Sequence, residues 1–474
     1  MSIIGITGHR RLKYPKTIRE EIRFSLQYFI SIHTLPQVSA ISAMAAGSDT
    51  IFAEEALALG IPVNAIFPFE EEEYQKDFTA EEWQQVMAVL SHPLCTLTIR
   101  HPGPVSSPEA RTAAYLATGE FLVQQSAVLL AVWDEQPAKG RGGTAEIVQY
   151  ALSHNREVHL VKGWRINSEE KGAGDRRLLE EFNSLDSRAI RFKEWLFEPA
   201  WIGGIIMGVL AAASFATGLA FGNQLTAQQR YIFSAGEAVC LLFSAILLLW
   251  LARRWKRKFL SYRKSAEYLR NLIRFRQAGI YVSGSTGSAD AALLSTAAAE
   301  AIMQPPAGPS MPYGLHTIRR LIWCFAAEQA AYQQQKRINR FTHRLHTTEK
   351  ILSYVKWLFF AVALLNFIVE SEHYFHFILI PGLHSFHDVL ILLWIVLPSV
   401  YAALEGVNYF SEWHTNIAIS GQIKAELEDT MKTVLHCKDE KSLTAAAENL
   451  RHTLERENKN WLQNFGKKEP DIKP

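Results

Sequence analysis

The sequence has few cysteines and almost no net charge. Four cysteines occur among 474 residues, and neither paired nor metal-ligand spacing relates them. This scarcity predicts a reducing compartment and argues against a disulfide framework or a zinc site. A formal net charge of +2 argues against a nucleic-acid-binding protein that relies on bulk electrostatics. We therefore expect no metal site and no nucleic-acid partner.

The common phosphate-binding fingerprints are also missing. The chain contains neither the Walker lysine motif nor G-x-G-x-x-G, which argues against an ordinary NTPase or a dinucleotide dehydrogenase. The opening residues, MSIIGITGHRRL, lack the charged region and long apolar core of a signal peptide. We interpret them as a first β-strand, with the N-terminus in the cytoplasm.

A change in composition near residue 198 divides the chain in two. Before it, short β-branched runs alternate with amphipathic helical stretches, whereas long apolar runs follow it. Alternation of strand and helix predicts an α/β doubly wound, Rossmann-like domain with a parallel sheet. The predicted strands are residues 3–8, 38–45, 63–69, 94–100, 127–133 and 157–162.

Glycine-rich and polar loops follow several of these strands. In a doubly wound sheet such loops meet at the carboxyl edge of the strands, where ligands bind. Helix N-termini there present unpaired N–H groups, and glycine lets an anion approach closely. We therefore predict a phosphate-bearing ligand at this edge. The residues in these loops are Gly8, His9, Arg10, Gly47, Ser48, Asp134, Arg141, Gly142, Gly143 and Thr144.

Each feature also has a plainer interpretation. The turn that contains Gly142 and Gly143, called the glycine turn below, can be a tight bend between strand and helix. Asp134 can contact a ribose hydroxyl or simply cap the next turn. The acidic run FEEEEYQKDF at 69–78 can be a solvated segment or a lid over the ligand site.

Four motifs in the first 165 residues give a resemblance to a known family. GITGHRRL, AAGSDTIFAEEALALG, PFEEEEYQKDF and YLATGEFLVQQSAVLLAVWDEQPAKGRGGTAEIVQYA follow in the order seen in the SLOG superfamily. That superfamily includes LOG-type nucleoside-monophosphate hydrolases, Smf/DprA proteins and the nucleotide-sensing N-terminal region of TRPM channels. The resemblance implies a nucleotide site formed by Gly8, His9 and Arg10, by Gly47 and Ser48, and by Gly142, Gly143 and Thr144.

Glu146 departs from the pattern of the hydrolase branch. There the glycine motif reads Pro-Gly-Gly-x-Gly-Thr-x-x-Glu with an adjacent arginine, whereas here Glu146 follows Thr144 by two residues. We interpret Glu146 as an acid that favours the helix dipole. A catalytic base is the alternative. The site therefore resembles a sensor that uses no cofactor and takes a nucleotide or ADP-ribose-type ligand as its signal.

The second half predicts four membrane-spanning helices in two hairpins. Residues 199–222 and 231–252 form the first pair, and 351–369 with 389–404, extendable to 410, form the second. The basic run at 253–258 and the absence of lysine and arginine from 370–388 place both termini in the cytoplasm. We expect a multi-pass protein of the cytoplasmic membrane.

Polar and small residues within these spans attract attention. Glu237 and Glu405 are costly in a membrane, so we expect them to face a bundle interior or a water path, although Glu405 can also mark the interface. Two G-x-x-x-G pairs, at 204 and 208 and at 218 and 222, can pack helices closely. A homo-oligomer is expected.

Two spans followed by a long amphipathic helix occur twice, which resembles the two-span SLATT domains of bacterial conflict systems. The predicted organisation is a SLOG-like domain at 1–190, SLATT-like modules at 191–282 and 315–435, a flexible linker at 283–314 and a polar C-terminal helix and tail at 436–474.

Three functions remain open at this stage. One is a membrane effector, gated by a nucleotide signal, that opens a pore or disrupts the bilayer in anti-phage defence. The second is a membrane-tethered nucleotide N-glycosidase of the LOG type, and the third a non-catalytic signalling scaffold. Four spans exceed what a tether needs, and the altered glutamate spacing disfavours the enzyme.

Overall fold

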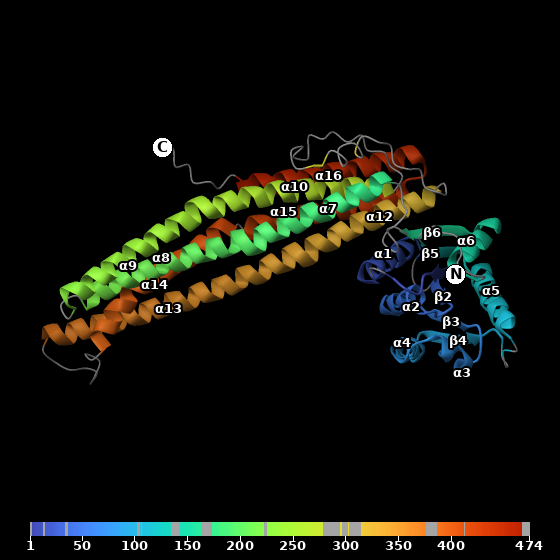
Figure 1. Ribbon diagram of the computed structural model, residues 1–474, viewed down its shortest axis with the longest axis horizontal. Helices are drawn as coiled ribbons and strands as arrows, with labels where there is room; N and C mark the ends of the chain where they lie inside the picture. Colours follow the sequence, from blue (N-terminus) through green and yellow to red (C-terminus); the bar gives the residue numbers. More distant parts are fainter. Residues whose placement is uncertain are drawn as a thin grey trace.

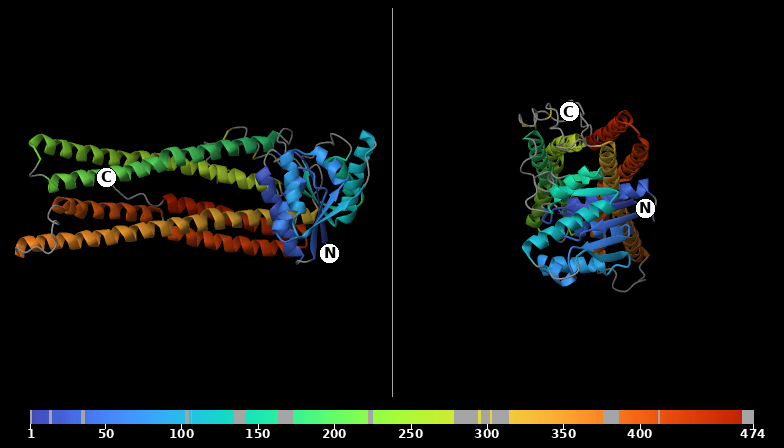
Figure 2. Two further views of the ribbon diagram at one scale, coloured as in Figure 1. Left: turned by 90° about the horizontal axis from the view of Figure 1, so that it is seen from below. Right: turned by 90° about the vertical axis from the view of Figure 1, so that its right-hand side faces the viewer.

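The protein consists of an α/β domain and an elongated helical bundle. In the computed structural model the α/β domain lies at one end, and the bundle extends away from it (Figure 1, Figure 2). The structure describes residues 2–12, 15–33, 37–101, 105, 107–133, 142–162, 173–221, 225–277, 294–295, 302, 314–375, 386–411 and 413–466.

Six strands form the sheet of the α/β domain. Their order is β4-β3-β2-β1-β5-β6, and every neighbouring pair is parallel. The predicted Rossmann-like parallel sheet is therefore confirmed. The strand order reverses at β1, which β2 and β5 flank. The strands are β1 (Ser2–Gly8), β2 (Val38–Ser42), β3 (Val63–Phe67), β4 (Cys95–Ile99), β5 (Val128–Trp133) and β6 (Glu157–Lys162).

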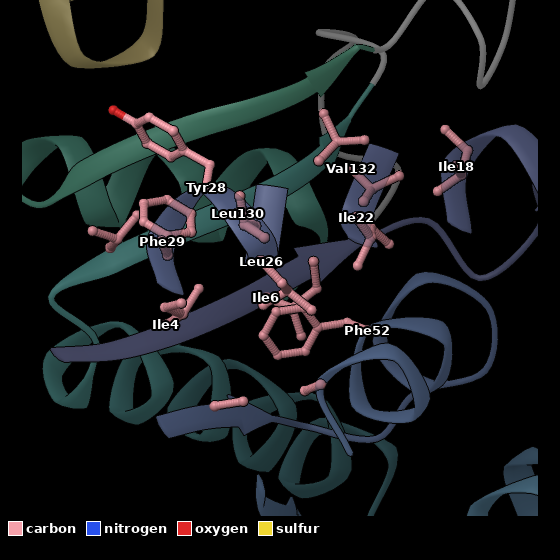
Figure 3. Close-up of a cluster of buried hydrophobic side chains, with 14 of the residues drawn as sticks. Ile4, Ile6, Ile18, Ile22, Leu26, Tyr28, Phe29, Phe52, Leu130 and Val132 are labelled. Carbon is pink, nitrogen blue, oxygen red and sulfur yellow. The ribbon is translucent and has the colours of Figure 1, made fainter. Parts of the chain in front are cut away.

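Helices cover both faces of the sheet. On one face Ile18, Ile22 and Leu26, four residues apart along α1, are fully buried against Ile4 and Ile6 of β1 (Figure 3). A second cluster joins α5 and α6 to the opposite face. All six residues of β5 are buried, as expected for a central strand covered twice. The helices are α1 (Pro15–Ile32), α2 (Ser48–Ala58), α3 (Glu71–Tyr74), α4 (Ala80–Leu90), α5 (Pro108–Gln125) and α6 (Thr144–Ser153).

The bundle is built from long helices that run out from the α/β domain and return (Figure 1). Three pairs of consecutive helices are joined by π-helical segments, at Phe192–Phe197, Ile246–Leu251 and Gln333–Ile338. The outer ends carry the α8–α9 and α13–α14 hairpins. The helices are α7 (Ala173–Arg191), α8 (Glu198–Ala220), α9 (Ala227–Ala245), α10 (Ala252–Gln277), α12 (Leu315–Tyr332), α13 (Asn339–Phe375), α14 (His387–Ser411), α15 (Trp413–His436) and α16 (Glu440–Gly466).

Among the described residues, three helices rather than the expected four are long and apolar enough to cross a membrane. They lie within Arg177–Gly218, Leu315–Ser371 and His387–Glu405. The expected span at 231–252 is not one of them. Its helix, α9, starts with two glutamines and Arg230 and also carries Glu237, and these residues lower its mean hydropathy. Of the four expected spans, the described residues therefore support three by length and composition.

Small residues join the first hairpin. Ser244 Oγ donates to the Gly204 carbonyl over 2.8 Å, and Ser214 Oγ donates to the Phe233 carbonyl over 2.9 Å. A Cβ on Gly208 would lie 3.6 Å from Ser244 Oγ, an ordinary contact distance between the two helices. The first G-x-x-x-G pair therefore serves contact between α8 and α9 within one chain. A second cluster, Val362, Val369, Leu390 and Leu397, joins α13 to α14.

Nearer the α/β domain, an apolar stripe on α10 packs against α7. Ala266, Leu269 and Ile273 are buried together with Leu178 and Leu185 of α7, and Tyr262 packs beside them. Helix α7 thus packs on the bundle, although the predicted boundary at residue 190 places it in the N-terminal domain. Of the predicted linker, all residues except 294, 295, 302 and 314 lie outside the described part of the chain.

Candidate functional site

The candidate site lies beyond the carboxyl ends of β1 and β5, where the strand order reverses. Open α/β sheets bind ligands at this point, because the flanking loops diverge to opposite faces there. Three described segments meet near it: the loop after β1, the start of α2 and the start of α6. The predicted residues of these segments are therefore brought to one edge of the sheet.

The loop after β1 rests directly on the start of α2. The His9 carbonyl accepts a hydrogen bond from Ser48 N over 3.3 Å, and Ser48 Oγ lies 3.2 Å from the same oxygen. His9 N donates to the Val132 carbonyl of β5 over 3.2 Å. These hydrogen bonds connect β1, β5 and α2 directly, so a displacement of one segment would strain its bonds to the others.

Two glycines are required by this close approach. A Cβ on Gly8 would lie 2.4 Å from Ser48 Oγ and 2.6 Å from Val132 Cβ. Gly47 has a φ of +89°, and a Cβ there would lie 2.3 Å from the Arg10 carbonyl. Steric need for glycine explains why sequence reasoning could select both positions.

The glycine turn precedes α6, as predicted. Gly142 has a φ of +76°, Gly143 is the N-cap and Thr144 is the first residue of the helix. The N-terminus of α6 therefore faces the same edge as that of α2. Asp134 and Arg141, which we also expect at the site, lie outside the described residues.

Glu146 is engaged with its own turn. Its Oε2 accepts a hydrogen bond from Gly142 N over 2.6 Å, while Glu146 N donates to the Gly143 carbonyl over 3.0 Å. A carboxylate in the first turn of a helix is stabilised by the dipole and here also closes the loop. This geometry is that of a capping residue.

Arg10 is an exposed cation beside the site. Its guanidinium lies 5.8 Å from the centre of the Tyr115 ring, a cation–π distance. The Tyr115 hydroxyl donates to Asp77 Oδ2. The Tyr115 ring thus lies beside Arg10 at this edge, where the exposed guanidinium can meet an anion.

The acidic run is anchored rather than freely solvated. Arg111 of α5 pairs with Glu73 Oε1 over 2.5 Å and with Asp77 Oδ2 over 2.7 Å. Hydrogen bonds from Lys76 and Arg111 lower the pKa of Glu73. Tyr74, which belongs to the run, is buried and donates from its hydroxyl to the Ala43 carbonyl over 2.9 Å. The run is thus fixed against the loop after β2.

Asp49 is a further candidate that the motif analysis did not select. Burial raises its pKa to about 7, although the hydrogen bond from Ser48, the charge of Arg10 and the Ala45 backbone oppose the shift. Asp49 Oδ1 lies 3.3 Å from Ser48 Oγ. A carboxyl that titrates near neutrality, one residue from the start of α2, can couple the charge of a bound ligand to proton uptake.

Local backbone strain also marks this region. Met44 follows β2 with a φ of +57°, a backbone conformation that is uncommon for residues other than glycine. Its side chain is fully buried. Met44 N donates to Ser42 Oγ over 3.1 Å. The loop that presents Gly47 is therefore held in a conformation that its sequence alone does not favour.

The two acids that we expect within membrane spans lie in the bundle, away from this edge. Glu237 of α9 is half-buried, and Glu405 near the end of α14 is exposed. The structure does not bring them together with the nucleotide-site candidates. Among the described residues, no group of three or more histidines, cysteines and acidic residues could hold a metal ion.

Comparison with models of protein families finds no match, and comparison with curated proteins finds no significant similarity. The geometry of the sheet edge and of the bundle therefore carries the functional argument.

Proposed function

We propose that the protein is a membrane effector that senses a nucleotide-derived anion at the switch point of its α/β domain. The observation that carries the proposal is the convergence of two helix N-termini, at Ser48 and Thr144, beside the exposed Arg10. Backbone N–H groups at helix starts and a guanidinium are what phosphate groups require. The SLOG resemblance supports a nucleotide or ADP-ribose derivative as the signal.

The exposed apolar surface of the bundle supports insertion into a bilayer. Ile202, Ile206 and Leu210 of α8 are each half-exposed, and Trp357 and Phe367 of α13 are about 70% exposed. Exposed apolar side chains along two long helices would promote aggregation in water, whereas lipid would cover them. Three apolar helices of sufficient length give the same indication.

We propose that α9 completes an even number of crossings. It packs along α8 and leads into α10, which returns to the end where α16 and the α/β domain lie. Tyr231, near the start of α9, is 74% exposed, and Trp250, in the π-helical segment that follows α9, is 60% exposed. They are about 28 Å apart along a straight helix, close to the ~30 Å of a bilayer core with aromatic side chains at both interfaces.

A direct connection runs from the α/β domain to the second hairpin. α12 packs on α1, where Trp323 meets Tyr28 edge to face with ring centres 5.7 Å apart. α12 then continues through the π-helical segment into α13. Because β6 follows α6 in the chain, a ligand that moves the start of α6 can bias the docking of α12. A ligand shifts such an equilibrium only by its unequal affinity for the two states.

The test uses full-length protein and a panel of mono-, di- and cyclic nucleotides and ADP-ribose derivatives. The ligand that raises the unfolding temperature most is then added to dye-loaded liposomes containing the protein. We expect dye release only with ligand, and recovery of the ligand intact. Dye release independent of every ligand, or ligand binding without any release, would contradict the proposal.

Two glycine variants make the test specific. Gly143 and Gly314 are both helix N-caps with extended backbones, of α6 and α12 respectively. Aspartate is a good N-cap, so both helices should form in G143D and G314D. Only G143D places a carboxylate at the proposed anion site, and only G143D should lose binding and release. A role in anti-phage defence rests on the SLATT resemblance alone and is part of the proposal.

A further inference from the structure

A band of exposed basic residues borders the apolar surface on α10. Arg254, Arg257 and Lys258 are exposed directly after Trp250. The Arg254 guanidinium lies 5.8 Å from the Trp250 ring centre, and Lys258 Nζ lies 5.5 Å from that of Phe192. No carboxylate among the described residues forms an ion pair with these three cations. Two of the three cations thus lie beside aromatic rings, and all three are exposed to the surroundings of the bundle.

The adjacent helix extends this band. α10 packs against α7 and against the π-helical segment Phe192–Phe197. Arg191 is exposed on α7, and Trp195 is 76% exposed. A tryptophan this exposed beside a cation is typical of a membrane interface, where one part of the ring is apolar and the other hydrated.

The second hairpin repeats the arrangement. Arg344 and Lys350 are exposed on α13, and exposed Tyr354 and Trp357 follow them. Arg254 and Lys350 both lie about 25 residues, or about 38 Å of helix, from the outer ends of their hairpins. The basic residues of the two hairpins therefore lie at a similar distance from the outer ends. They border the apolar surface on its side nearer the α/β domain.

We propose that this basic band binds the phosphate headgroups of anionic phospholipids in the leaflet that faces the α/β domain. Charge complementarity selects an anion, and continuity with the exposed apolar helices selects one that carries acyl chains. Each basic residue near an anionic surface contributes about fivefold in affinity. The inference rests on the proposed membrane insertion but not on the sensing of any nucleotide.

The experiment measures unfolding of the full chain in an uncharged detergent with added phosphatidylglycerol or phosphatidylcholine. We expect phosphatidylglycerol to raise the unfolding temperature more, with half-saturation at a lower mole fraction. R254Q/R257Q/K258Q should weaken this response about a hundredfold. K432Q/K438Q/K441Q removes three exposed lysines from α15, α16 and their connection, far from the proposed interface, and should retain it.

Further arms separate the lipid from other anions and from misfolding. R254K/R257K keeps the charges and should keep the preference for phosphatidylglycerol. Equal responses to the two lipids, or full preference in the triple glutamine variant, would overturn the proposal. So would glycerol phosphate, which lacks acyl chains, if it were as effective as phosphatidylglycerol at the same concentration. If the triple variant does not fold, K258Q alone must still reduce the preference several-fold. Nucleotide is absent throughout, so failure here leaves the sensing proposal untouched.

Discussion

Arg320 of α12 donates a hydrogen bond from Nε to His159 Nδ1 of β6 over 3.0 Å. The same guanidinium donates to Ser25 Oγ of α1 over 2.7 Å and to the Leu160 carbonyl over 2.6 Å. Arg320 is buried, and its three acceptors belong to the α/β domain. Because an arginine cannot accept, Nδ1 of His159 must be unprotonated, and Nε2–H donates to Glu157 Oε1 over 2.5 Å. One side chain thus fixes the helix that leads into the second hairpin.

Arg320→Met should uncouple the α/β domain from the second hairpin. It removes three buried hydrogen bonds and leaves acceptors without a donor, so we expect a loss of about 2–4 kcal/mol in the free energy of unfolding. Nucleotide binding should persist in folded protein, whereas ligand-induced dye release should fall. Calorimetry and liposome assays measure the two effects.

Arg23→Met serves as the control. Arg23 is half-exposed and shares Glu55 with Arg19, so its loss should cost less than about 1 kcal/mol and leave release unchanged. Equal effects of the two variants on release would show that Arg320 has no special coupling role.

Stability should fall in acid because of His159. Burial lowers its pKa to about 4, against the hydrogen bond to Glu157 that raises it. The unfolded chain, with a histidine pKa of about 6.5, binds the proton first, so unfolding is favoured as pH falls. The contribution is fully present above pH 6.5, declines between about 6.5 and 4, and amounts to about 3 kcal/mol.

His159→Asn isolates this contribution. The amide oxygen can accept from Arg320 but does not titrate in this range. Between pH 7 and 4 the wild type should therefore lose more stability than the variant, as measured by denaturant unfolding in detergent. Parallel pH profiles would mean that His159 is not the responsible group.

The α/β sheet could be predicted from sequence because each strand is a β-branched run between amphipathic helices. Gly8 and Gly47 could be predicted as well, since close backbone contact demands glycine. The Arg320 contacts could not, because Arg320 and Ser25 are 295 residues apart. A buried arginine also contradicts the apolar periodicity by which a packed helix face is recognised.

For the expected span at 231–252, the sequence pattern predicts more than the structure supports. Its length and freedom from charge at 231–252, apart from Glu237, predict a span, yet the helix also includes the polar residues that precede Tyr231. Arg111 and Tyr115 were missed for a different reason. Their partners Glu73 and Asp77 lie 38 residues away in the chain, and no motif links them.

The position of α9 is tested by labelling. If α9 crosses the bilayer, Gln228 near its start faces outward, and Lys441 in α16 faces the side of the α/β domain. We expect a cysteine at 228 to react with an impermeant maleimide in intact spheroplasts. A cysteine at 441 should react only after permeabilisation, and the parent protein measures the background. Protection of position 228 in intact spheroplasts would remove the hairpin from the proposal.

Ligand affinity should depend on pH through Asp49. A bound phosphate disfavours a nearby carboxylate, so binding raises the pKa of Asp49 above its value of about 7. By linkage, affinity rises as pH falls, by about three- to fourfold between pH 8 and 6 if the coupling is about 1 kcal/mol. Titration calorimetry should use a cyclic nucleotide or ADP-ribose, whose phosphates keep their charge in this range. Asp49→Asn should remove this part of the pH dependence, and an unchanged profile would exclude Asp49.

Glu146 distinguishes a sensor from an enzyme. Its carboxylate accepts a hydrogen bond from Gly142 N over 2.6 Å, and the amide oxygen of Gln can accept the same bond. Glu146→Gln should therefore preserve the turn, with a cost below about 1 kcal/mol for the weaker dipole interaction. If the residue caps the turn, ligand affinity and dye release stay within about threefold of the wild type, and chromatography recovers intact ligand. A catalytic base cannot be replaced by an amide, because glutamine does not accept a proton near neutral pH. Turnover of the ligand to a free base by the wild type, lost in this variant and unaccompanied by leakage, would identify a nucleotide N-glycosidase instead.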